Sequence, residues 1–380
     1  MLDISLIVLS AGASTRFKMK VKKQWIRVGD IPLWVYATNN LNKTYAFKDV
    51  IVTGNADELF YMYKFTDFKI IEGGNTRQSS LINALQHVKT KYVLVSDAAR
   101  CCVPPFLVRR LLNEAGSADS IVPYLTVADT VAYENDTAIH RDKVKLIQTP
   151  QLSLTQALKE ALIQKSEFTD ESSAIKANGG SVKYILGDIA AEKLTTLDAN
   201  SSIFSLLKAP VKDCFYGNGF DVHAFEEAKP MYLGGVKIDT DFGFKAHSDG
   251  DVAIHALIDA LLAAAGGGDI GEWFPDFDER YKNIDSTKLL ENVCGFLARV
   301  GFEIIHCDLT IIAQRPKILP YKQAISKKLA SILNIPSVHV NVKATTTEHL
   351  GFIGREEGIG VLASATLKYY DWTADENINR

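Results

Sequence analysis

Cysteine is scarce in this sequence, and the few cysteines do not form a pattern typical of a disulfide framework or of a thiolate zinc site. There are five in 380 residues, and none of them belongs to a C-x-x-C motif. The odd number and the spacing exclude a disulfide-rich scaffold and favour a reducing compartment. The cysteines are Cys101, Cys102, Cys214, Cys294 and Cys307.

Long hydrophobic runs are also missing. A membrane-spanning helix needs about 18 consecutive apolar residues, and the richest stretch, residues 254–265, is interrupted by His255 and Asp259. The N-terminus has no basic leader and its apolar run ends at Leu9, so no signal peptide is predicted. We therefore expect a cytoplasmic protein with no membrane partner.

An excess of charge of either sign is absent as well. The 42 basic and 45 acidic residues leave a net charge of −3, which gives no global positive field for a nucleic-acid partner. Any anion that the protein binds must therefore be held by local groups. A hydrophobic content of 47% is ordinary for a globular protein, and the length predicts about two to three domains.

Apolar runs of strand length alternate with helical patterns in the first half of the chain. These runs are continuous, which is typical of strands in a parallel sheet covered on both faces. We predict an α/β fold whose N-terminal part, residues 1–207, is a doubly wound, mostly parallel, Rossmann-like sheet. The predicted strands are residues 4–9, 50–52, 68–71 and 92–95, with a helix at 79–88.

A linker and a second unit follow. A short helix is predicted over residues 197–207, and Pro210 in the linker 208–214 cannot extend it. Residues 215–380 carry their own pattern and predict a smaller α/β sheet-and-helix domain. Its predicted helices are residues 249–265, 286–300 and 321–333, and its predicted strands are 309–313, 338–342 and 359–367.

A loop of small residues follows the first predicted strand. It runs from Ser10 to Arg16 and precedes Lys23. Small residues let backbone amides approach a phosphate, and the two basic side chains supply positive charge; a plain tight turn would look the same. Polar clusters at residues 72–80 and 96–100 follow later strands, so all three are expected at the edge where such sheets bind ligands.

These residues resemble the 2-C-methyl-D-erythritol 4-phosphate cytidylyltransferase family over residues 3–207. Seven markers occur in order, which is far more specific than any one of them. They are Ala11-Gly12 with Arg16 and Lys23, Gly73-Gly74 with Arg77 and Ser80, Asp97-Ala98-Ala99-Arg100, Asp129-Thr130, Thr149-Pro150-Gln151, Thr169-Asp170-Glu171 and Lys193-Leu194-Thr195.

The resemblance implies a nucleotidyltransferase in which methylerythritol phosphate attacks the α-phosphorus of CTP and expels pyrophosphate. No protein nucleophile is implied, so basic side chains with Mg²⁺ or Mn²⁺ would act by positioning and electrostatic stabilisation. The implied catalytic residues are Arg16, Lys23, Arg141 and Lys193. The implied substrate-binding residues are Ala11, Gly12, Gly74, Asn75, Ser80, Asp97, Arg100, Thr130, Thr149 and Thr169.

Two positions depart from the family pattern. Ser14 stands where the family usually has a second glycine, and Lys22 stands where it has a proline before the catalytic lysine. Ser14 would be strained if its φ were positive. We expect Lys22 to be a solvated surface charge.

An aspartate and two histidines in the second half have the pattern of a metal site. Asp221 and His223 are two apart in an extended segment and share one face. A helix is expected to begin near Ser248 as its N-cap, which places His255 in the second turn. Each histidine alone is more often structural, but Asp-His-His with an open fourth position suits a catalytic Zn²⁺.

Together with the motifs around them, these residues resemble the 2-C-methyl-D-erythritol 2,4-cyclodiphosphate synthase family over about residues 215–370. Its motifs are nearly intact. They are Gly217 to His223, His247 to Asp251, Gly268 to Gly271 with Phe274 to Asp276, Gln314 to Lys317, Lys343 to Glu348, and Leu350 to Phe352 with Gly354-Arg355.

The second resemblance implies that the 2-phosphate of CDP-methylerythritol 2-phosphate attacks the β-phosphorus and releases CMP. Zn²⁺ or another divalent metal would be held by Asp221, His223 and His255, and Mg²⁺ or Mn²⁺ would bind near Glu348. Thr346 and Glu348 are the implied catalytic residues. The implied substrate-binding residues are His247, Ser248, Asp269, Gly271, Ala313, Lys317, Leu319, Thr345, Thr347, Phe352 and Arg355.

The same resemblance implies a homotrimer with sites between subunits, and pairing of N-terminal domains would extend it to a hexamer. The two reactions are not consecutive, and no ATP-kinase motif occurs in the sequence, so a separate CDP-methylerythritol kinase is an expected functional partner. We expect a bifunctional enzyme of the non-mevalonate isoprenoid pathway. The alternatives are a nucleotide-binding scaffold without chemistry in one half, or a sugar-phosphate nucleotidyltransferase fused to a zinc hydrolase.

Overall fold

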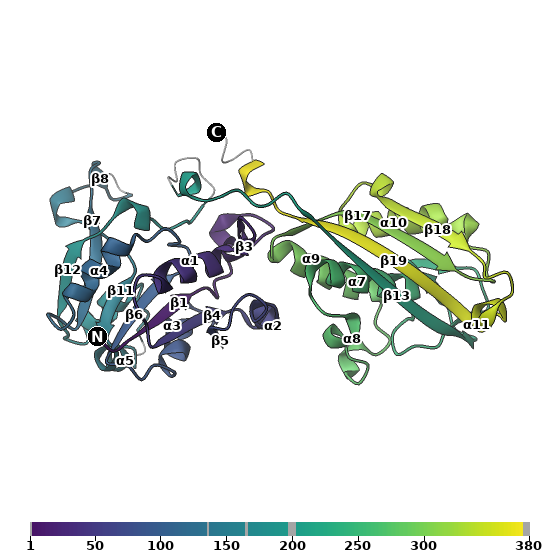
Figure 1. Cartoon of the computed structure of the whole chain (residues 1–380), viewed down its shortest axis with the longest axis horizontal. Coiled ribbons are helices and arrows are strands. Elements are labelled where there is room, and N and C mark those ends of the chain that lie inside the picture. The colour runs from purple at the N-terminus through teal and green to yellow at the C-terminus, as the bar shows by residue number, and fades with distance from the viewer. Residues whose placement is uncertain (1, 135–136, 164–165, 197–202, 375–380) are drawn as a thin grey trace. The chain divides into compact units, whose positions relative to one another are not determined.

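The computed structural model describes residues 2–134, 137–163, 166–196 and 203–374. The chain divides into two compact units (Figure 1), one formed by Met1–Pro210 with Asp371–Arg380 and the other by Val211–Tyr370. Each unit has its own sheet and core. No described helix is long and apolar enough to cross a membrane.

The first unit is built on a sheet in which β1, β4, β5 and β6 run parallel and β11 runs antiparallel to β6. The order is β10-β7-β11-β6-β1-β4-β5, with β12 parallel to β7. The mostly parallel α/β fold is thereby confirmed. The strands are β1 (Ile4–Leu9), β4 (Asp49–Gly54), β5 (Lys69–Glu72), β6 (Tyr92–Asp97), β7 (Ser120–Thr126), β10 (Lys145–Ile147), β11 (Gln151–Leu154) and β12 (Val182–Leu186).

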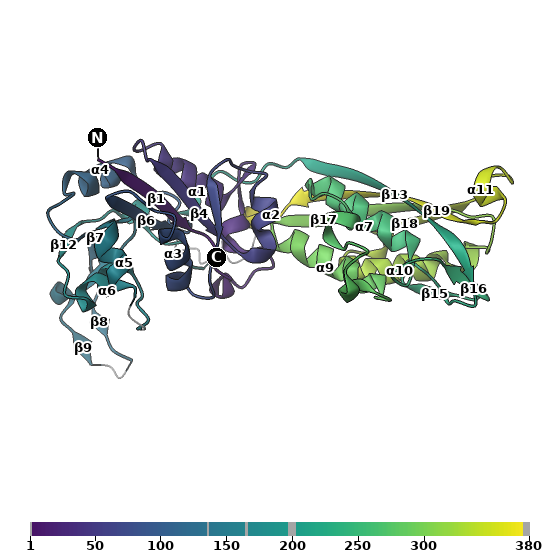
Figure 2. The ribbon, with the colours of Figure 1, turned by 90° about the horizontal axis from the view of Figure 1, so that it is seen from below.

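Helices cover both faces of this sheet, as Figures 1 and 2 show. Helices α1 (Leu33–Asn42) and α4 (Pro105–Asn113) lie on one face, and α3 (Arg77–Leu85), α5 (Thr155–Ala161) and α6 (Glu171–Ala177) lie on the other. Alternate residues of β1 supply both cores: Ile7 packs in the cluster with α3, α5 and α6, and Leu6 is fully buried without belonging to that cluster. The continuous apolar strands follow from burial on both sides.

Short elements surround the sheet of the first unit. Their bounds are α2 (Leu59–Met62), β2 (Arg27–Val28), β3 (Ile31–Pro32), β8 (Val131–Ala132) and β9 (Ala138–Ile139). The first unit also includes Trp372, which is buried, lies against Phe204 with ring centroids 5.3 Å apart and donates a hydrogen bond to the carbonyl of Arg27. The structure thus groups the residues from Asp371 onward with the first unit, whereas the sequence predicted a second domain over residues 215–380.

The second unit has a five-stranded sheet in the order β16-β13-β19-β17-β18. Strand β19 runs antiparallel to β13 and β17, and β18 runs parallel to β17. Strands β14 (Met231–Leu233) and β15 (Val236–Ile238) form a separate hairpin. The sheet strands are β13 (Cys214–Glu227), β16 (Phe242–Phe244), β17 (Phe302–Ile312), β18 (Val340–Thr345) and β19 (Gly358–Tyr369).

One face of this sheet packs against helices, of which α7 (Val252–Ala265) is buried almost all round. Gly217 and Gly219 of β13 make this approach possible, because a Cβ at Gly219 would lie 2.2 Å from the carbonyl oxygen of Ala256. The other helices are α8 (Ile270–Trp273), α9 (Ser286–Arg299), α10 (Lys322–Leu333) and α11 (Gly351–Gly354).

The opposite face of the second sheet carries exposed apolar side chains. Residues that alternate with the two glycines along β13 point to this face, and the partner strand adds Leu362 opposite Phe220. Such a patch on a sheet is typical of an interaction surface. The exposed apolar residues are Tyr216, Phe220, Val222 and Leu362.

Two sequence predictions need correction or fall outside the described residues. Helix α7 begins at Val252, not at 249, because its N-cap is Asp251 and not Ser248. The Asp251 carboxylate accepts from the backbone N–H of Ile254 and also from Gly234 and Gly235, so it fixes the helix start and a neighbouring turn together. Most of the predicted helix at 197–207 lies in residues 197–202, outside the described residues, and what is described is a 3-10 turn at Phe204–Leu206.

Candidate active sites

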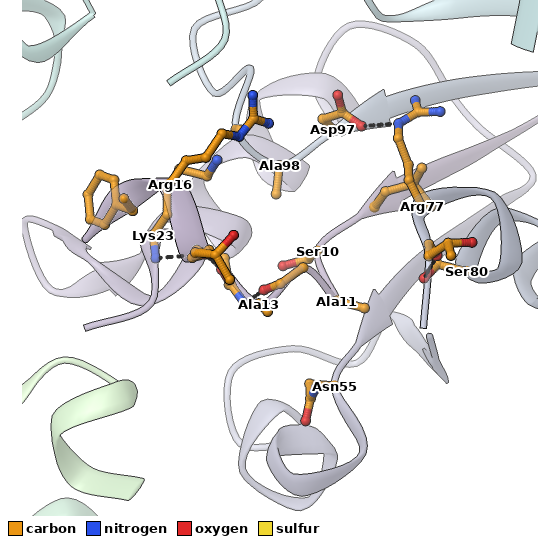
Figure 3. Close-up of a pocket in the computed structure, with 18 of the residues that line it drawn as sticks. Ser10, Ala11, Ala13, Arg16, Lys23, Asn55, Arg77, Ser80, Asp97 and Ala98 are labelled. Atoms are coloured by element: carbon orange, nitrogen blue, oxygen red, sulfur yellow. Dashed lines mark hydrogen bonds and ion pairs between the residues drawn. The ribbon is translucent and has the colours of Figure 1, made fainter. Parts of the chain in front are cut away.

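A cavity of about 480 Å³ lies at the carboxyl edge of the first sheet (Figure 3). Arg16 and Lys23 line one side, and Arg77 and Ser80 line the other. The three polar clusters predicted to meet at this edge therefore do so. The predicted residues that line the cavity are Ala11, Gly12, Arg16, Lys23, Gly74, Asn75, Ser80, Asp97 and Lys193.

The loop after β1 is strained at the position where it departs from the family. Ser14 has φ 58°, in the left-handed region that favours glycine. Its hydroxyl donates a 2.8 Å hydrogen bond to Gln24 Oε1 and accepts one of 3.2 Å from the Lys23 backbone N–H. These two bonds hold Ser14 against the segment that carries Lys23.

Asp97 is the centre of a buried ionic network. Arg77 Nε donates to one carboxylate oxygen at 2.9 Å, and Lys193 Nζ donates to the other at 2.6 Å. Arg77 also pairs with the buried Glu171 at 2.7 Å. Burial opposes ionisation of Asp97, but the charges and hydrogen bonds of Arg77 and Lys193 outweigh burial and hold the pKa of Asp97 well below its usual range.

Lys23 is largely buried and lies near other positive charges, and both effects lower the pKa of its ammonium group. Burial and the charges of Lys193 and Arg16 together lower its pKa to about 8, against the opposing effect of Asp97. A bound polyphosphate would reverse this balance by supplying negative charge. The free cavity is therefore an anion site whose positive charges repel one another.

A smaller cavity of about 230 Å³ adjoins the first, and Arg77, Asp97 and Lys193 line both. Three predicted substrate-binding residues, Arg100, Thr149 and Thr169, line the smaller cavity. Lys193 thus faces two neighbouring spaces, as transfer between two bound anions requires.

Two predicted residues, Thr130 and Arg141, line neither cavity. Arg141 is exposed, and its guanidinium donates to the carbonyl of Ala128 at 2.6 Å. Both residues belong to the segment around the β8–β9 hairpin, which extends away from the sheet in Figure 2. Within one chain, the described fold does not bring this segment into either cavity.

The prediction that Lys22 is a solvated surface charge is wrong. Its side chain is 14% exposed and forms an ion pair with Glu58, which is 1% exposed. The other Glu58 oxygen accepts a 2.6 Å hydrogen bond from the buried Trp25 indole. Lys22 is recruited inward because the buried Glu58 carboxylate needs a charged partner.

The predicted metal triad of the second unit forms in the structure. Asp221 Oδ2 lies 3.6 Å from His223 Nε2 and 3.3 Å from His255 Nδ1. One ligand atom from each residue lies within 4.8 Å of the others, as in a site that holds one metal ion. Among the described residues, this is the group with metal-ligand geometry.

Outer contacts orient both imidazoles. His223 Nδ1 lies 3.0 Å from the carbonyl of Gly250, which fixes its proton there and leaves Nε2 for a metal. Ser286 donates its hydroxyl proton to Asp249, so its oxygen accepts from His255 Nε2, 3.0 Å away. His255 Nδ1 is then free to bind. Such outer partners are typical of metal histidines.

Burial and charge also favour the metal-binding protonation states. Burial lowers the pKa of His223 and keeps its ring neutral. Burial opposes ionisation of Asp221, but His255 and His223, when their rings carry the extra proton, lower its pKa below the ordinary value. A carboxylate beside two imidazoles is a donor set that suits Zn²⁺.

The triad opens into a cavity of about 520 Å³. The predicted His247, Ser248 and Gly271 line it. Asp269 does not, because its carboxylate caps α8 through the backbone N–H of Glu272 at 2.9 Å.

The remaining predicted residues lie elsewhere in the second unit. Thr346 and Glu348 are exposed after β18 and are joined by a 2.8 Å hydrogen bond. One chain therefore does not bring these residues to the triad's cavity. The predicted residues that do not line the triad's cavity are Ala313, Lys317, Leu319, Thr345, Thr346, Thr347, Glu348, Phe352 and Arg355.

Sequence reasoning missed several residues of both sites. Asn55 follows β4 at the same edge of the first sheet, so the strand-end rule could have found it. Asp259 lines the second cavity, and its position four residues after His255 on α7 placed it on the same helix face. Ser286 had no local signal, because only packing brings α9 to His255.

Comparisons with known proteins identify a family for each half of the chain. The family model described as 2-C-methyl-D-erythritol 4-phosphate cytidylyltransferase matches residues 4–203, and the YgbB family matches residues 214–368. Proteins called bifunctional enzyme IspD/IspF are 58% identical in Aliarcobacter butzleri and 56% identical in Campylobacter fetus. Each match covers 98% of this chain and 99% of the relative.

A solved structure shares the whole fold. The structure of the bifunctional IspDF from Campylobacter jejuni matches with a TM-score of 0.88 and 49% identity, covering 98% of this chain and all of the other. The chain belongs to the bifunctional IspD/IspF family of isoprenoid biosynthesis, and carries an IspD cytidylyltransferase domain and an IspF cyclodiphosphate synthase domain.

Proposed function

We propose that the two adjoining cavities of the first unit hold the two substrates of cytidylyl transfer. CTP occupies the larger cavity, with Gly74, Asn75 and Ser80 at the cytosine and Asp97 at the ribose. Methylerythritol phosphate occupies the smaller one, at Thr149 and Thr169. The observation that carries this assignment is that Asp97 and Lys193 line both cavities.

The reaction in this unit needs charge stabilisation and alignment. The phosphate oxygen of methylerythritol phosphate attacks the α-phosphorus, and pyrophosphate leaves. Arg16 and Lys23 hold the phosphates of CTP, and Lys193 stabilises the charge between the substrates. Mg²⁺ or Mn²⁺ bound with the triphosphate supplies additional positive charge. Lys193 would exchange its bond to Asp97 for the substrate phosphates.

We propose that the second unit performs cyclisation at the Asp221, His223 and His255 cluster. The donor set fits Zn²⁺ or a similar divalent ion, which when bound supplies Lewis acidity to a phosphate oxygen. His223 and His255 keep their metal-binding nitrogens deprotonated through Gly250 and Ser286. Ser248 and the backbone at Gly271 line the space for the substrate. Glu348 is the proposed residue near a second cation, Mg²⁺ or Mn²⁺.

We propose that the second unit assembles as a homotrimer through its exposed sheet face. The patch of Tyr216, Phe220, Val222 and Leu362 needs a partner, and a second copy of the chain is the occupant that the family resemblance implies. In such an assembly the cytidine residues, such as Ala313 and Lys317, would come from a neighbouring chain. Phe352 and Arg355 would lie near the axis.

The segment that carries Thr130 and Arg141 supports a second kind of pairing. Because it leaves its own sheet, we propose that it reaches the small cavity of a second N-terminal unit and gives a hexamer. We place the enzyme in the cytoplasm with a separate CDP-methylerythritol kinase, which adds the 2-phosphate between the two reactions.

Light scattering of the intact chain and of Leu362→Glu tests the trimer. The variant is expected to dissociate.

The assignment of both sites is tested by two single variants of the intact chain. Lys23→Ala should remove cytidylyl transfer and leave cyclisation, and His255→Ala should do the reverse. Pyrophosphate release from CTP and CMP release from CDP-methylerythritol 2-phosphate measure the two reactions in one sample. Loss of both reactions in either variant would contradict two separate sites.

A further inference from the structure

The segment before α1 that carries Lys23 is tied down from two sides by residues with no assigned role. Lys23 begins a 3-10 turn, Lys23–Trp25. On one side, the residue before it and the last residue of the turn, Lys22 and Trp25, both bind Glu58. On the other side, Ser14 binds the Lys23 backbone N–H and the Gln24 side chain.

Glu58 is a buried carboxylate, and each of its two oxygens needs a partner. It is 1% exposed, and its two carboxylate oxygens are satisfied by the Lys22 ammonium and the Trp25 indole N–H. Removing the cation would leave a buried carboxylate with one neutral partner. Glu58 ends the turn Ala56–Glu58, whose N-cap is Asn55 in the CTP cavity. Glu58 therefore joins the wall that carries Asn55 to the turn that carries Lys23.

Ser14 supplies the opposite anchor from the phosphate loop. It keeps a left-handed conformation that glycine would adopt more easily. Its hydroxyl gives the loop something that glycine lacks, a direct bond to the backbone of Lys23. Gln24 adds a 2.9 Å hydrogen bond to the carbonyl of Gly12.

Lys23 needs such anchoring because its surroundings push it away. The groups that face it are Arg16 on the preceding turn, Lys193 after the last strand of the sheet, Asp97 at the end of β6 and the thiol of Cys101. Two of these are cations, and only one is a carboxylate. A long flexible ammonium in this position would move toward water unless its backbone were fixed.

We propose that the Lys22–Glu58 ion pair and the Ser14 hydroxyl are positioning groups that hold Lys23 in the CTP cavity. This inference rests on the proposed role of Lys23 in cytidylyl transfer. Neither Lys22 nor Glu58 lines the cavity, so both act through Lys23. Ser14 lines the cavity and acts through the Lys23 backbone.

The test compares Lys22→Met, Lys22→Arg, Ser14→Ala and Ser14→Gly in the full chain. Lys22→Met should lower kcat for cytidylyl transfer about tenfold to 100-fold, because a catalytic group displaced by an ångström costs that much. Lys22→Arg keeps the charge and should recover most of the rate. Both Ser14 variants should lose about threefold to tenfold, although glycine relieves the backbone strain.

A pH profile separates positioning from general damage. In the free enzyme, the pKa of Lys23 is lowered to about 8 by burial, Lys193 and Arg16. If Lys22→Met frees Lys23, the basic limb of kcat/KM for CTP should move to higher pH. Cyclisation in the same sample should be unchanged, as should both reactions in Lys183→Met, which breaks the exposed Lys183–Glu114 pair of the same unit.

The outcomes distinguish the two levels of the proposal. If Lys23→Ala retains transfer, the assigned role of Lys23 fails, and the positioning role fails with it. If Lys23→Ala is inactive but Lys22→Met and Ser14→Ala keep full rates, only the positioning role is overturned. A rate loss in Lys22→Met with an unmoved basic limb and a lowered unfolding temperature would also overturn it.

Discussion

The cavity of the first unit is lined by four Lys and Arg side chains, whereas that of the second is lined by one, Lys245, and contains the cluster of one carboxylate and two histidines. Both units act on phosphates attached to cytidine. In the first, the positive charge is covalently part of the chain, through Arg16, Lys23, Arg77 and Lys193. In the second, Asp221, His223 and His255 are suited to bind a metal ion that would supply positive charge.

This difference changes what the surrounding residues must do. Covalent cations repel one another when the site is free, so the first unit needs anchors such as Glu58 and Ser14. Burial and this repulsion together lower the pKa of Lys23. The two imidazole ligands of the second unit instead need hydrogen bonds that set their tautomers, from Gly250 and Ser286. The cationic side chains of the first unit must be held in place, and the metal-binding imidazoles of the second unit must be oriented.

The largest expected effect is on the metal cluster. His255→Ala removes one of three ligands, and loss of several kcal/mol of charge stabilisation lowers cyclisation on the order of 10³-fold or more. Bound divalent metal, measured by mass spectrometry after dialysis, should fall from about one per chain to near zero. Unchanged metal content would break the comparison, because the charge of the second site would then come from elsewhere.

Removal of a fixed cation should have the next largest effect. Lys23→Ala is expected to slow cytidylyl transfer about 10²-fold to 10³-fold, since one preorganised group that stabilises the transition state is lost. The rate of pyrophosphate release at saturating CTP measures this. Metal content should stay at the wild-type value; a fall in metal content would contradict independent units.

The outer contacts of the metal site should matter less. Ser286→Ala removes the nearer of the two hydroxyl groups at His255 Nε2 and leaves Ser248 at 3.3 Å, so metal affinity should fall about tenfold to 100-fold. Competition with a chromophoric chelator gives this affinity. Ser173→Ala in the first unit, whose hydroxyl donates to the carbonyl of Asp170, is a matched serine control and should leave metal affinity unchanged.

The smallest effect is a difference in pH dependence. The pKa of Lys23 is lowered from 10.5 to about 8, so Lys23 is charged below that pH and loses its charge as the pH rises through it. We expect kcat/KM for CTP to fall about tenfold per pH unit above about 8. Lys23→Arg, which stays charged, should move this limb upward. A limb that persists at the same pH in Lys23→Arg would assign the titration to another group.

Much of this architecture follows from sequence patterns. The continuous strands predicted the parallel sheet, and the rule for strand ends predicted where Ala11, Gly74 and Asp97 would meet. The period of two along β13 and the helix position of His255 predicted the metal cluster. These signals are local and periodic, so they can be recognised without a structure.

What could not be predicted depends on long-range packing. The inward turn of Lys22 is set by Glu58, which is 36 residues away, and no local pattern marks that partner. The start of α7 is set by Asp251 because the same carboxylate binds Gly234 and Gly235. Ser286 reaches His255 only because α9 packs beside α7. The positions of Arg141 and Thr346 outside the cavities follow from the fold of a single chain.

The most direct test of the comparison is selective metal restoration. The intact chain is stripped with a strong chelator, the chelator is removed, and both reactions are assayed with Mg²⁺ alone and then with Mg²⁺ and Zn²⁺. Mg²⁺ alone should restore cytidylyl transfer fully and leave cyclisation at background until Zn²⁺ is added. Full recovery of both reactions with Mg²⁺ alone, or a zinc requirement for transfer, would contradict a first site of fixed cations beside a second site of metal ligands.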